Sequence, residues 1–216
     1  MYTLRFCSDK LPFSILKDGN LYVNCNSIPQ FDIVYIRHYN VVIRNLKGDF
    51  MMAQLFKKQE IYDLLDSKGI SYQKMEHPAA FTMEQMEEYG ITKKGTVCKN
   101  LFLRDFKGKN HFLVTVIGDK KVDMRQLAEK IGSSKLSFGS AERLMKYIGV
   151  EQGSVSPLGI LNDESKSVVM VFDRDLKDDL EVGVHPNDNT ATLWLSFDDI
   201  CGLIREHGSE IMLIEF

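Results

Sequence analysis

The stretch "VCKNLFLRDFKGKN", Val97 to Asn110, contains the apolar run Leu101-Phe102-Leu103 and is followed by "HFLVTVIG". Short apolar runs bounded by turn residues are typical of buried strands. The segment around Lys107-Gly108-Lys109 separates the two runs and is suited to a tight turn. The sequence therefore predicts a β-hairpin whose first strand belongs to the protein core.

Lys99 and Asn100 directly precede this apolar run, which places a cation beside a core strand. Because side chains alternate along a strand, Lys99 shares a side with Leu101 and Leu103, whereas Asn100 lies on the other side. A lysine on a buried side has to reach the opening of a cavity or an anion. The alternative is a lysine at a strand end that extends outward to water. The residues alone leave both interpretations open.

Helix and strand signals surround the hairpin. Four predicted helices begin at polar capping residues, namely Thr82 with Gln85, Asp123 with Gln126, Ser140, and Ser196 with Asp199. A fifth is predicted within "QLFKKQEIYDLLDSKG", and the glycines that end the five helices are Gly69, Gly90, Gly132, Gly149 and Gly208. Further strands are predicted in "ISYQKMEH", "SVVMVFD", "LEVGVHP", "TATLWLS" and "EIMLIEF". Because the order has no regular β-α-β rhythm, the pattern predicts an α+β fold with a mixed, strongly curved sheet.

The composition is that of an ordinary globular protein, with 216 residues, 44% of them hydrophobic and 26% charged. No run approaches the roughly 18 apolar residues of a membrane span, so no membrane partner is expected. The four cysteines, Cys7, Cys25, Cys98 and Cys201, are widely spaced. This spacing argues against a zinc site or a disulfide framework and favours a reducing cytoplasm.

Charge is unevenly distributed along the chain. Between Lys93 and Arg125 there are nine basic and three acidic residues, whereas from Glu151 to the end there are fourteen acidic and four basic ones. A basic stretch of this kind can hold a phosphate-containing ligand on one face. On charge alone, solvated loops and helix faces are the simpler explanation.

Three further stretches carry residues suited to a binding site. "GSVSPLG", Gly153 to Gly159, has small residues that let a backbone approach a ligand closely. "GVHPNDNTAT", Gly183 to Thr192, places a histidine and hydrogen-bonding side chains at a turn, and "EHPAAFT", Glu76 to Thr82, is suited to a pocket wall. Taken singly, each is more simply explained as a connecting loop or turn. The chain has no GxGxxG, GxxxxGK[ST], HExxH or GxSxG motif, which counts against the common nucleotide-binding, zincin and α/β-hydrolase classes.

Taken together, the order HP…FT, "KNLFLRD", "LSFGSAERL", "GSVSPLG" and "HPNDNTAT" resembles the YbaK / prolyl-tRNA editing family. The resemblance is strongest to the freestanding deacylases called ProX, PrdX or ProXp-ala, and it extends from about Gln54 to Phe216. It implies one compact α+β domain with a mixed, curved, barrel-like sheet flanked by helices. It also implies hydrolysis of the ester that joins a wrong amino acid to the 3′ end of a tRNA.

By position, the resemblance implies three catalytic residues, Lys99, Asn100 and His185. The residues that it implies for substrate binding are Phe81, Thr82, Gly153, Ser156, Pro157, Gly159, Asn189 and Thr190. Lys99 is expected to hold a phosphate or to polarise the ester, and the loop backbone to position a water and stabilise the oxyanion. No metal and no cofactor are expected.

The expected substrate is Ala-tRNA(Pro), bound by the acceptor end of tRNA(Pro), and a transient contact with prolyl-tRNA synthetase is a further expectation. Cys-tRNA(Pro), the substrate of the YbaK branch, stays open because one methylene is worth only about 1–3 kcal/mol. A non-catalytic tRNA-binding or regulatory module is the alternative from another class. The presence of the complete set of family positions favours the enzyme.

Residues 1–50 differ from the editing domain that is expected over residues 51–216. They hold eight of the 22 aromatic residues and show no clear helical period. The stretch "LKGDFMM" can be encoded with the bacterial ribosome-binding sequence AGGAG ahead of Met51 and Met52. We therefore expect residues 1–50 to arise from a spurious translation start. The alternative is a genuine extension, such as a small strand pair or a tRNA-contacting arm.

Overall fold

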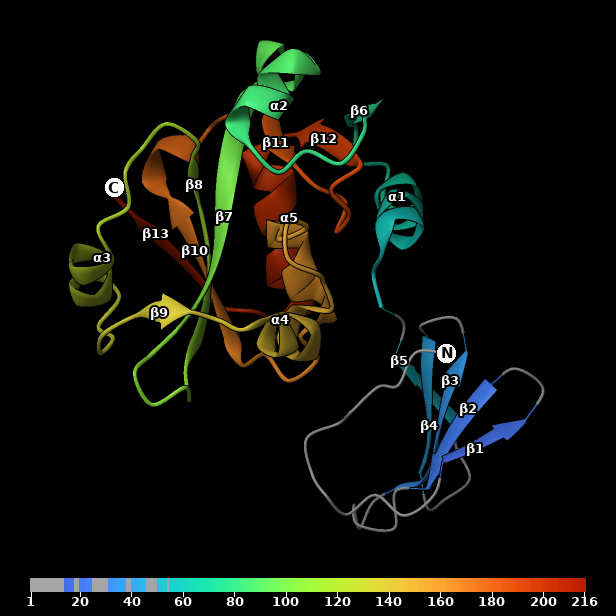
Figure 1. Cartoon of the computed structure of the whole chain (residues 1–216). Helices are drawn as coiled ribbons and strands as arrows, with labels where there is room; N and C mark the ends of the chain where they lie inside the picture. The colour runs from blue at the N-terminus through green and yellow to red at the C-terminus, as the bar shows by residue number, and fades with distance from the viewer. Residues whose placement is uncertain (1–13, 18–19, 25–30, 38–39, 46–49, 54) are drawn as a thin grey trace. The chain divides into compact units, whose positions relative to one another are not determined.

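The computed structural model describes residues 14–17, 20–24, 31–37, 40–45, 50–53 and 55–216. The chain divides between Leu55 and Phe56 into two compact units, and each is a body of its own (Figure 1). The N-terminal unit is an antiparallel sheet in the order β1-β2-β3-β4-β5. Its strands are β1 Ser14–Lys17, β2 Asn20–Asn24, β3 Phe31–Arg37, β4 Asn40–Asn45 and β5 Phe50–Ala53. This sheet therefore runs past Met51, where the sequence pattern placed the boundary.

The C-terminal unit contains one mixed sheet of eight strands in the order β13-β10-β8-β7-β11-β12-β6, with β9 paired to β7. Its strands are β6 Gln73–Glu76, β7 Thr96–Arg104, β8 His111–Ile117, β9 Ser137–Phe138, β10 Val168–Asp173, β11 Val182–Val184, β12 Ala191–Leu195 and β13 Ile211–Ile214. Its α-helices are α1 Lys58–Ser67, α2 Met83–Glu88, α3 Met124–Lys130, α4 Ala141–Ile148 and α5 Phe197–His207. Three 3₁₀ helices complete it, η1 Ile91–Lys93, η2 Pro157–Asn162 and η3 Arg174–Leu176. The predicted α+β fold with a mixed sheet is confirmed.

The predicted hairpin of β7 and β8 lies at the centre of this sheet (Figure 1). Residues Cys98 to Arg104 of β7 pair antiparallel with β8, while Thr96 and Val97 pair parallel with β11. Strand β10 then runs parallel to β8, and β13 runs parallel to β10. β7 is therefore the one path that joins the β8–β10–β13 part of the sheet to the β11–β12–β6 part.

Both faces of β7 are covered. Phe102 packs into a core that includes residues of α4, α5 and η2. Leu103 and Leu101 belong to a second core beneath α3. Because the two faces are buried against different helices, alternation along β7 separates two apolar environments instead of a core from solvent.

The predicted helix starts are confirmed by capping geometry. Thr82 Oγ1 accepts a hydrogen bond from the Gln85 N–H, and Asp123 Oδ1 accepts bonds from Arg125 and Gln126. The remaining caps, Ser140 and Ser196, accept from the backbone N–H groups of Arg143 and Asp199. Each cap satisfies N–H groups that have no partner within the helix, so these boundaries follow from local chemistry.

Two elements differ from the sequence prediction. The stretch "GSVSPLG" is more than an open loop, because Pro157 begins the 3₁₀ helix η2, whose residues 157–160 are buried. The short strand β9 was not predicted, since two residues carry no periodic signal and it forms only by pairing with Leu103 and Arg104. Among the described residues, no helix is long and apolar enough to cross a membrane.

Candidate active site

Asn100 of β7 and His185, which directly follows β11, line the same small pocket. The parallel pairing of β7 with β11 brings these two residues together from positions far apart in the sequence. The rest of the lining is Met86, Val97, Cys98, Gly183, Val184 and Thr192. The pocket is thus largely apolar, with a few polar groups that can fix the orientation of a ligand.

The amide of Asn100 has a defined orientation. Its Oδ1 accepts a hydrogen bond of 2.6 Å from the hydroxyl of Thr115, a fully buried residue of β8. The carbonyl end is therefore occupied within the sheet, and the Nδ2 amide remains as the donor that Asn100 can offer to a ligand. Thr115, which the sequence analysis did not single out, makes Asn100 a hydrogen-bond donor in the pocket.

His185 is held in one tautomer. Its Nδ1 lies 3.0 Å from the carbonyl oxygen of Ala191, which can only accept, so Nδ1 carries the hydrogen and Nε2 has the free lone pair. Burial lowers the pKa of His185, and the bond to Ala191 and the nearby Asp188 only partly oppose this effect. The imidazole is thereby held neutral, with a proton-accepting nitrogen at Nε2.

Ser156 fixes the backbone of His185. The fully buried hydroxyl of Ser156 donates a hydrogen bond of 2.5 Å to the His185 carbonyl and accepts one from the Leu158 N–H. Ser156 is the cap of η2, so this helix and the histidine are joined through one side chain. Ser156 therefore supports the position of His185.

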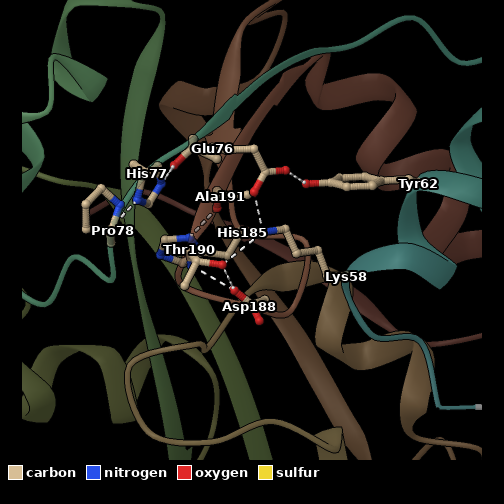
Figure 2. A network of polar contacts seen from close by, with 10 residues as sticks. Lys58, Tyr62, Glu76, His77, Pro78, His185, Asp188, Thr190 and Ala191 are labelled. Carbon is tan, nitrogen blue, oxygen red and sulfur yellow. Dashed lines mark hydrogen bonds and ion pairs between the residues drawn. The ribbon is translucent and has the colours of Figure 1, made fainter.

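A second histidine, His77, lies beside this pocket; the sequence predicted its stretch, Glu76 to Thr82, as a pocket wall but did not predict this residue. Its ring lies near that of His185 (Figure 2), with a distance of 6.5 Å between the ring centres. Its Nε2 is 3.0 Å from the hydroxyl oxygen of Thr192. Both histidines precede a proline, at Pro78 and Pro186. The repeated His-Pro dipeptide is the feature of the sequence that could have pointed to His77. The antiparallel pairing of β6 with β12 places His77 next to Thr192.

Lys58 of α1 connects this helix to the stretch from Gly183 to Thr192 (Figure 2). Its ammonium group forms an ion pair with Glu76 and donates a bond of 2.9 Å to Thr190 Oγ1. The Thr190 hydroxyl and N–H in turn donate to Asp188. Burial raises the pKa of Asp188, but these bonds outweigh burial and hold the pKa below its usual value. Asp188 is thus an anion near His185.

Three residues predicted for substrate binding meet at another point of the surface. A Cβ atom on Gly153 would lie 2.9 Å from the ring of Phe81 and 3.3 Å from Asn189 Nδ2. Phe81 keeps 67% of its surface exposed. Phe81, Gly153 and Asn189 therefore form an accessible aromatic and amide surface, while Thr82 next to it serves as the cap of α2.

The structure does not bring every predicted residue to the pocket. Lys99 lies on the face of β7 that Leu101 and Leu103 share, and its Nζ contacts the Gly118 carbonyl at 3.4 Å. The pocket lining contains Asn100 but not Lys99. Gly159 lies inside the fold, where a Cβ atom would meet Ile148 and Asn187 at 3.5 Å. Gly159, like the buried Pro157, serves the packing of η2.

The chemistry of the lining limits the mechanism. Burial raises the pKa of the Cys98 thiol to about 12, so this group is not a thiolate at neutral pH. Within residues 55–216 and the described strands before them, no three His, Cys, Asp or Glu side chains are grouped so as to hold a metal ion. In this pocket Asn100 offers its Nδ2 as a donor and His185 offers its Nε2 as an acceptor.

Comparison with known proteins shows which family this chain belongs to. The family model described as the aminoacyl-tRNA editing domain matches residues 77–203, which include Asn100, His185 and Thr192. The chain belongs to the aminoacyl-tRNA editing family. It is 45% identical over 158 residues to the prolyl-tRNA editing protein ProX of Acetoanaerobium sticklandii, covering 73% of this chain and 96% of that protein. The expected resemblance to the prolyl-tRNA editing family is confirmed.

Two further comparisons concern a sequence relative and a solved structure of similar fold. The prolyl-tRNA synthetase associated domain-containing protein 1 of Mus musculus is 31% identical over 168 residues, which cover 76% of this chain and 99% of that protein. The crystal structure of a candidate trans-editing enzyme for prolyl-tRNA synthetase matches with a TM-score of 0.56 and 19% identity, over 74% of this chain and 96% of the other. This likeness supports the editing-domain fold.

Proposed function

We propose that this protein hydrolyses the ester of mischarged tRNA and that its substrate is Ala-tRNA(Pro). The observation that carries the proposal is the meeting of Asn100 and His185 in one pocket, in a chain 45% identical to a prolyl-tRNA editing protein. The hydrogen-bond donor and the neutral imidazole match the two needs of ester hydrolysis, which are stabilisation of an oxyanion and activation of water.

The reaction follows from these two groups. A water adds to the ester carbonyl while His185 Nε2 takes one of its protons, and Asn100 Nδ2 donates to the oxygen that becomes negative. The tetrahedral intermediate then expels the 3′ oxygen of the terminal ribose, which receives the proton from His185. The products are the free amino acid and the tRNA with its 3′ hydroxyl. An aminoacyl ester is already reactive, so no protein nucleophile is required.

Alanine is proposed as the substrate side chain because the stretches "KNLFLRD" and "LSFGSAERL" resemble the alanine branch of the family. Cysteine adds one sulfur atom to alanine, and a difference of this size is worth only about 1–3 kcal/mol in an apolar pocket. Cys-tRNA(Pro) is therefore the competitor that an experiment has to include.

The surface outside the pocket supports tRNA as the partner. Aromatic rings are common stacking platforms for unpaired bases, and the exposed Phe81 lies against the Gly153 loop. We assign Lys99 to the phosphate backbone instead of to the ester, because it lies on the face of β7 away from Asn100. The protein would work in the cytoplasm on the acceptor end of tRNA(Pro), and the name of the mouse relative supports a transient contact with prolyl-tRNA synthetase.

A deacylation time course tests the proposal. Purified protein is mixed with tRNA(Pro) charged with alanine, cysteine, serine or proline, and an Asn100→Ala protein with an unchanged melting temperature serves as the control. We expect fast release of alanine, slower release of cysteine and no release of proline. Preferential release of cysteine would identify the other branch of the family. Binding of tRNA without release of any amino acid would indicate a non-catalytic module and refute the proposal.

A further inference from the structure

The proposed reaction leaves the hydroxyl of Thr192 in the pocket without a role. Thr192 is 2% exposed, belongs to β12 and lines the same pocket as Asn100 and His185. A polar group buried in a largely apolar pocket needs hydrogen-bond partners. The contacts of His77 show which kind of partner Thr192 can take.

His77 determines the direction of the hydrogen bond to Thr192. The Nδ1 atom of His77 is 2.8 Å from the carbonyl oxygen of Pro78, which can only accept, so in the neutral ring Nδ1 is the donor. Nε2 is then an acceptor, and at 3.0 Å it receives the hydroxyl hydrogen of Thr192. A hydroxyl has one hydrogen and two lone pairs. Thr192 Oγ1 can therefore only accept a hydrogen bond from a ligand.

The polar groups of the pocket thus have fixed and different characters. Asn100 offers a donor because Thr115 occupies its carbonyl oxygen, and His185 offers an acceptor because Ala191 occupies its Nδ1. Thr192 is a second acceptor, distinct from the one that activates water. A ligand that satisfies all three groups has to carry a donor of its own next to a carbonyl group.

We propose that Thr192, oriented by His77, binds the α-amino group of the aminoacyl ester. This inference rests on the proposed hydrolysis of aminoacyl-tRNA and adds a recognition element to it. The α-amino group is a donor in both its protonated and its neutral form, and it is bonded to the carbon beside the ester carbonyl. With the carbonyl on Asn100 and the amine on Thr192, the ester is bound at two points. The site therefore selects for esters that carry a free α-amino group.

The test compares alanyl-tRNA(Pro) with propionyl-tRNA(Pro), which has the same carbon skeleton but no amine. Both are assayed at pH 8, and each rate is divided by that of uncatalysed hydrolysis, because the amine itself activates the ester. We expect the wild-type protein to favour the alanyl ester in kcat/KM by roughly tenfold or more, the usual effect of losing a hydrogen bond to a buried polar group. Thr192→Val, which keeps the shape but removes the hydroxyl, should bring the ratio close to one, and Thr192→Ser should restore it.

Two controls separate recognition from structure. Thr92→Val makes the same chemical change in η1, outside the pocket lining, and should leave the ratio unchanged. His77→Leu removes the acceptor that orients Thr192 and should reduce the ratio several-fold in a protein that keeps its β6–β12 pairing. If the wild-type protein cleaves both esters with equal normalised efficiency, the role of Thr192 is refuted while the proposed hydrolysis stands. If Thr192→Val slows both esters equally, Thr192 is a structural residue. Cleavage of neither ester refutes the proposed function itself.

Discussion

The orientation of one amide, that of Asn100, depends on a residue that never touches the ligand. Thr115 is fully buried, and its hydroxyl is the group that holds Asn100 Oδ1. Thr115→Val keeps the volume and removes this bond. We expect kcat to fall roughly five- to tenfold, because about 1 kcal/mol of orientation is lost. Single-turnover deacylation measures this change, and thermal melts should show a nearly native protein.

The matched control for this prediction is Thr115→Ser, which keeps the hydroxyl and should keep most of the rate. An Asn100→Ala protein is expected to be insensitive to the additional Thr115→Val change, because the two residues act through one donor. Independent, additive losses in the double variant would show that Thr115 acts through packing instead of through Asn100.

The titration of His185 gives a prediction on pH. Burial lowers its pKa below 6.5, so the folded protein resists protonation of this ring where an ordinary histidine would accept a proton. We expect kcat/KM to be constant through neutral pH and to fall only at pH values below 6.5. The same sign holds for stability, since the unfolded chain binds the proton more readily and folding is weakened as the pH falls through this range.

The measurement is a pH–rate profile of the wild-type protein beside that of His185→Asn. The variant should be slow at every pH and should lack the acid limb that belongs to this ring. A wild-type acid limb centred above 6.5 would contradict the assignment, because it would require a raised pKa at the catalytic base.

At the scale of elements, the loop before η2 is fixed by contact with the segment that enters α2. Gly153 has φ +89°, a conformation that glycine adopts readily, and a Cβ at this position would lie 2.9 Å from the Phe81 ring. Gly153→Ala should therefore displace Phe81 and reduce activity more than stability, since both residues are exposed. Deacylation rates and melting temperatures are compared with those of Gly69→Ala, whose φ is +65° but whose Cβ meets nothing within 4 Å. Equal losses of activity in both variants would refute a role for this contact.

Elements of this fold differ in how far the sequence predicts them. The starts of α3, α4 and α5 were predictable because a cap such as Ser196 bonds to a backbone N–H only three residues away. Strand β9 was not, because its pairing with Leu103 is a tertiary event. The order of the strands was equally hidden, since the pairing of β7 with β11 joins Val97 to Gly183.

The residues of the candidate site also differ in how far the sequence predicts them. Asn100 and His185 were found by resemblance to a family, and their residue types agree with the chemistry. Their meeting in one pocket depends on strand order. Alternation correctly placed Lys99 and Asn100 on opposite faces of β7, but it could not tell which face holds the pocket, because both are buried. The stretch around His77 was predicted as a pocket wall, but the role of His77 itself was not, because its partner Thr192 is remote in sequence.

At the scale of the whole molecule, charge predicts how affinity for tRNA depends on salt. Lys93 and Lys94 are exposed before β7, and Lys107 and Lys109 are exposed in the turn after it. Changing all four to glutamine should weaken binding and flatten the slope of log affinity against log salt, by somewhat under about one unit for each phosphate that is no longer neutralised. The control changes four exposed lysines elsewhere, Lys130, Lys135, Lys166 and Lys177. An identical slope in both variants would show that the basic stretch does not contact phosphates and serves only solubility.

The division of the chain at Leu55 and Phe56 leads to a prediction about the N-terminal unit. We propose that residues 1–50 do not contribute to editing, in line with the expected spurious start. The cut has to spare Phe56, whose N–H donates to Asn162 Oδ1 at 2.6 Å and whose carbonyl accepts from Asn187 at 2.6 Å. It also has to spare Lys58, which bonds to Thr190.

A chain that begins at Leu55 should therefore keep the melting temperature and the deacylation rate of the full-length protein. A chain that begins at Gln59 should lose both, because Asn162 and Asn187 then lose their hydrogen bonds to the backbone of Phe56, and Thr190 loses its bond to Lys58. If the first truncation is as damaging as the second, the N-terminal sheet is part of the working enzyme. Tryptic peptides from Tyr2 to Lys47, found by mass spectrometry in the natural host, would show that translation starts before Met51 and would end the idea of a spurious start.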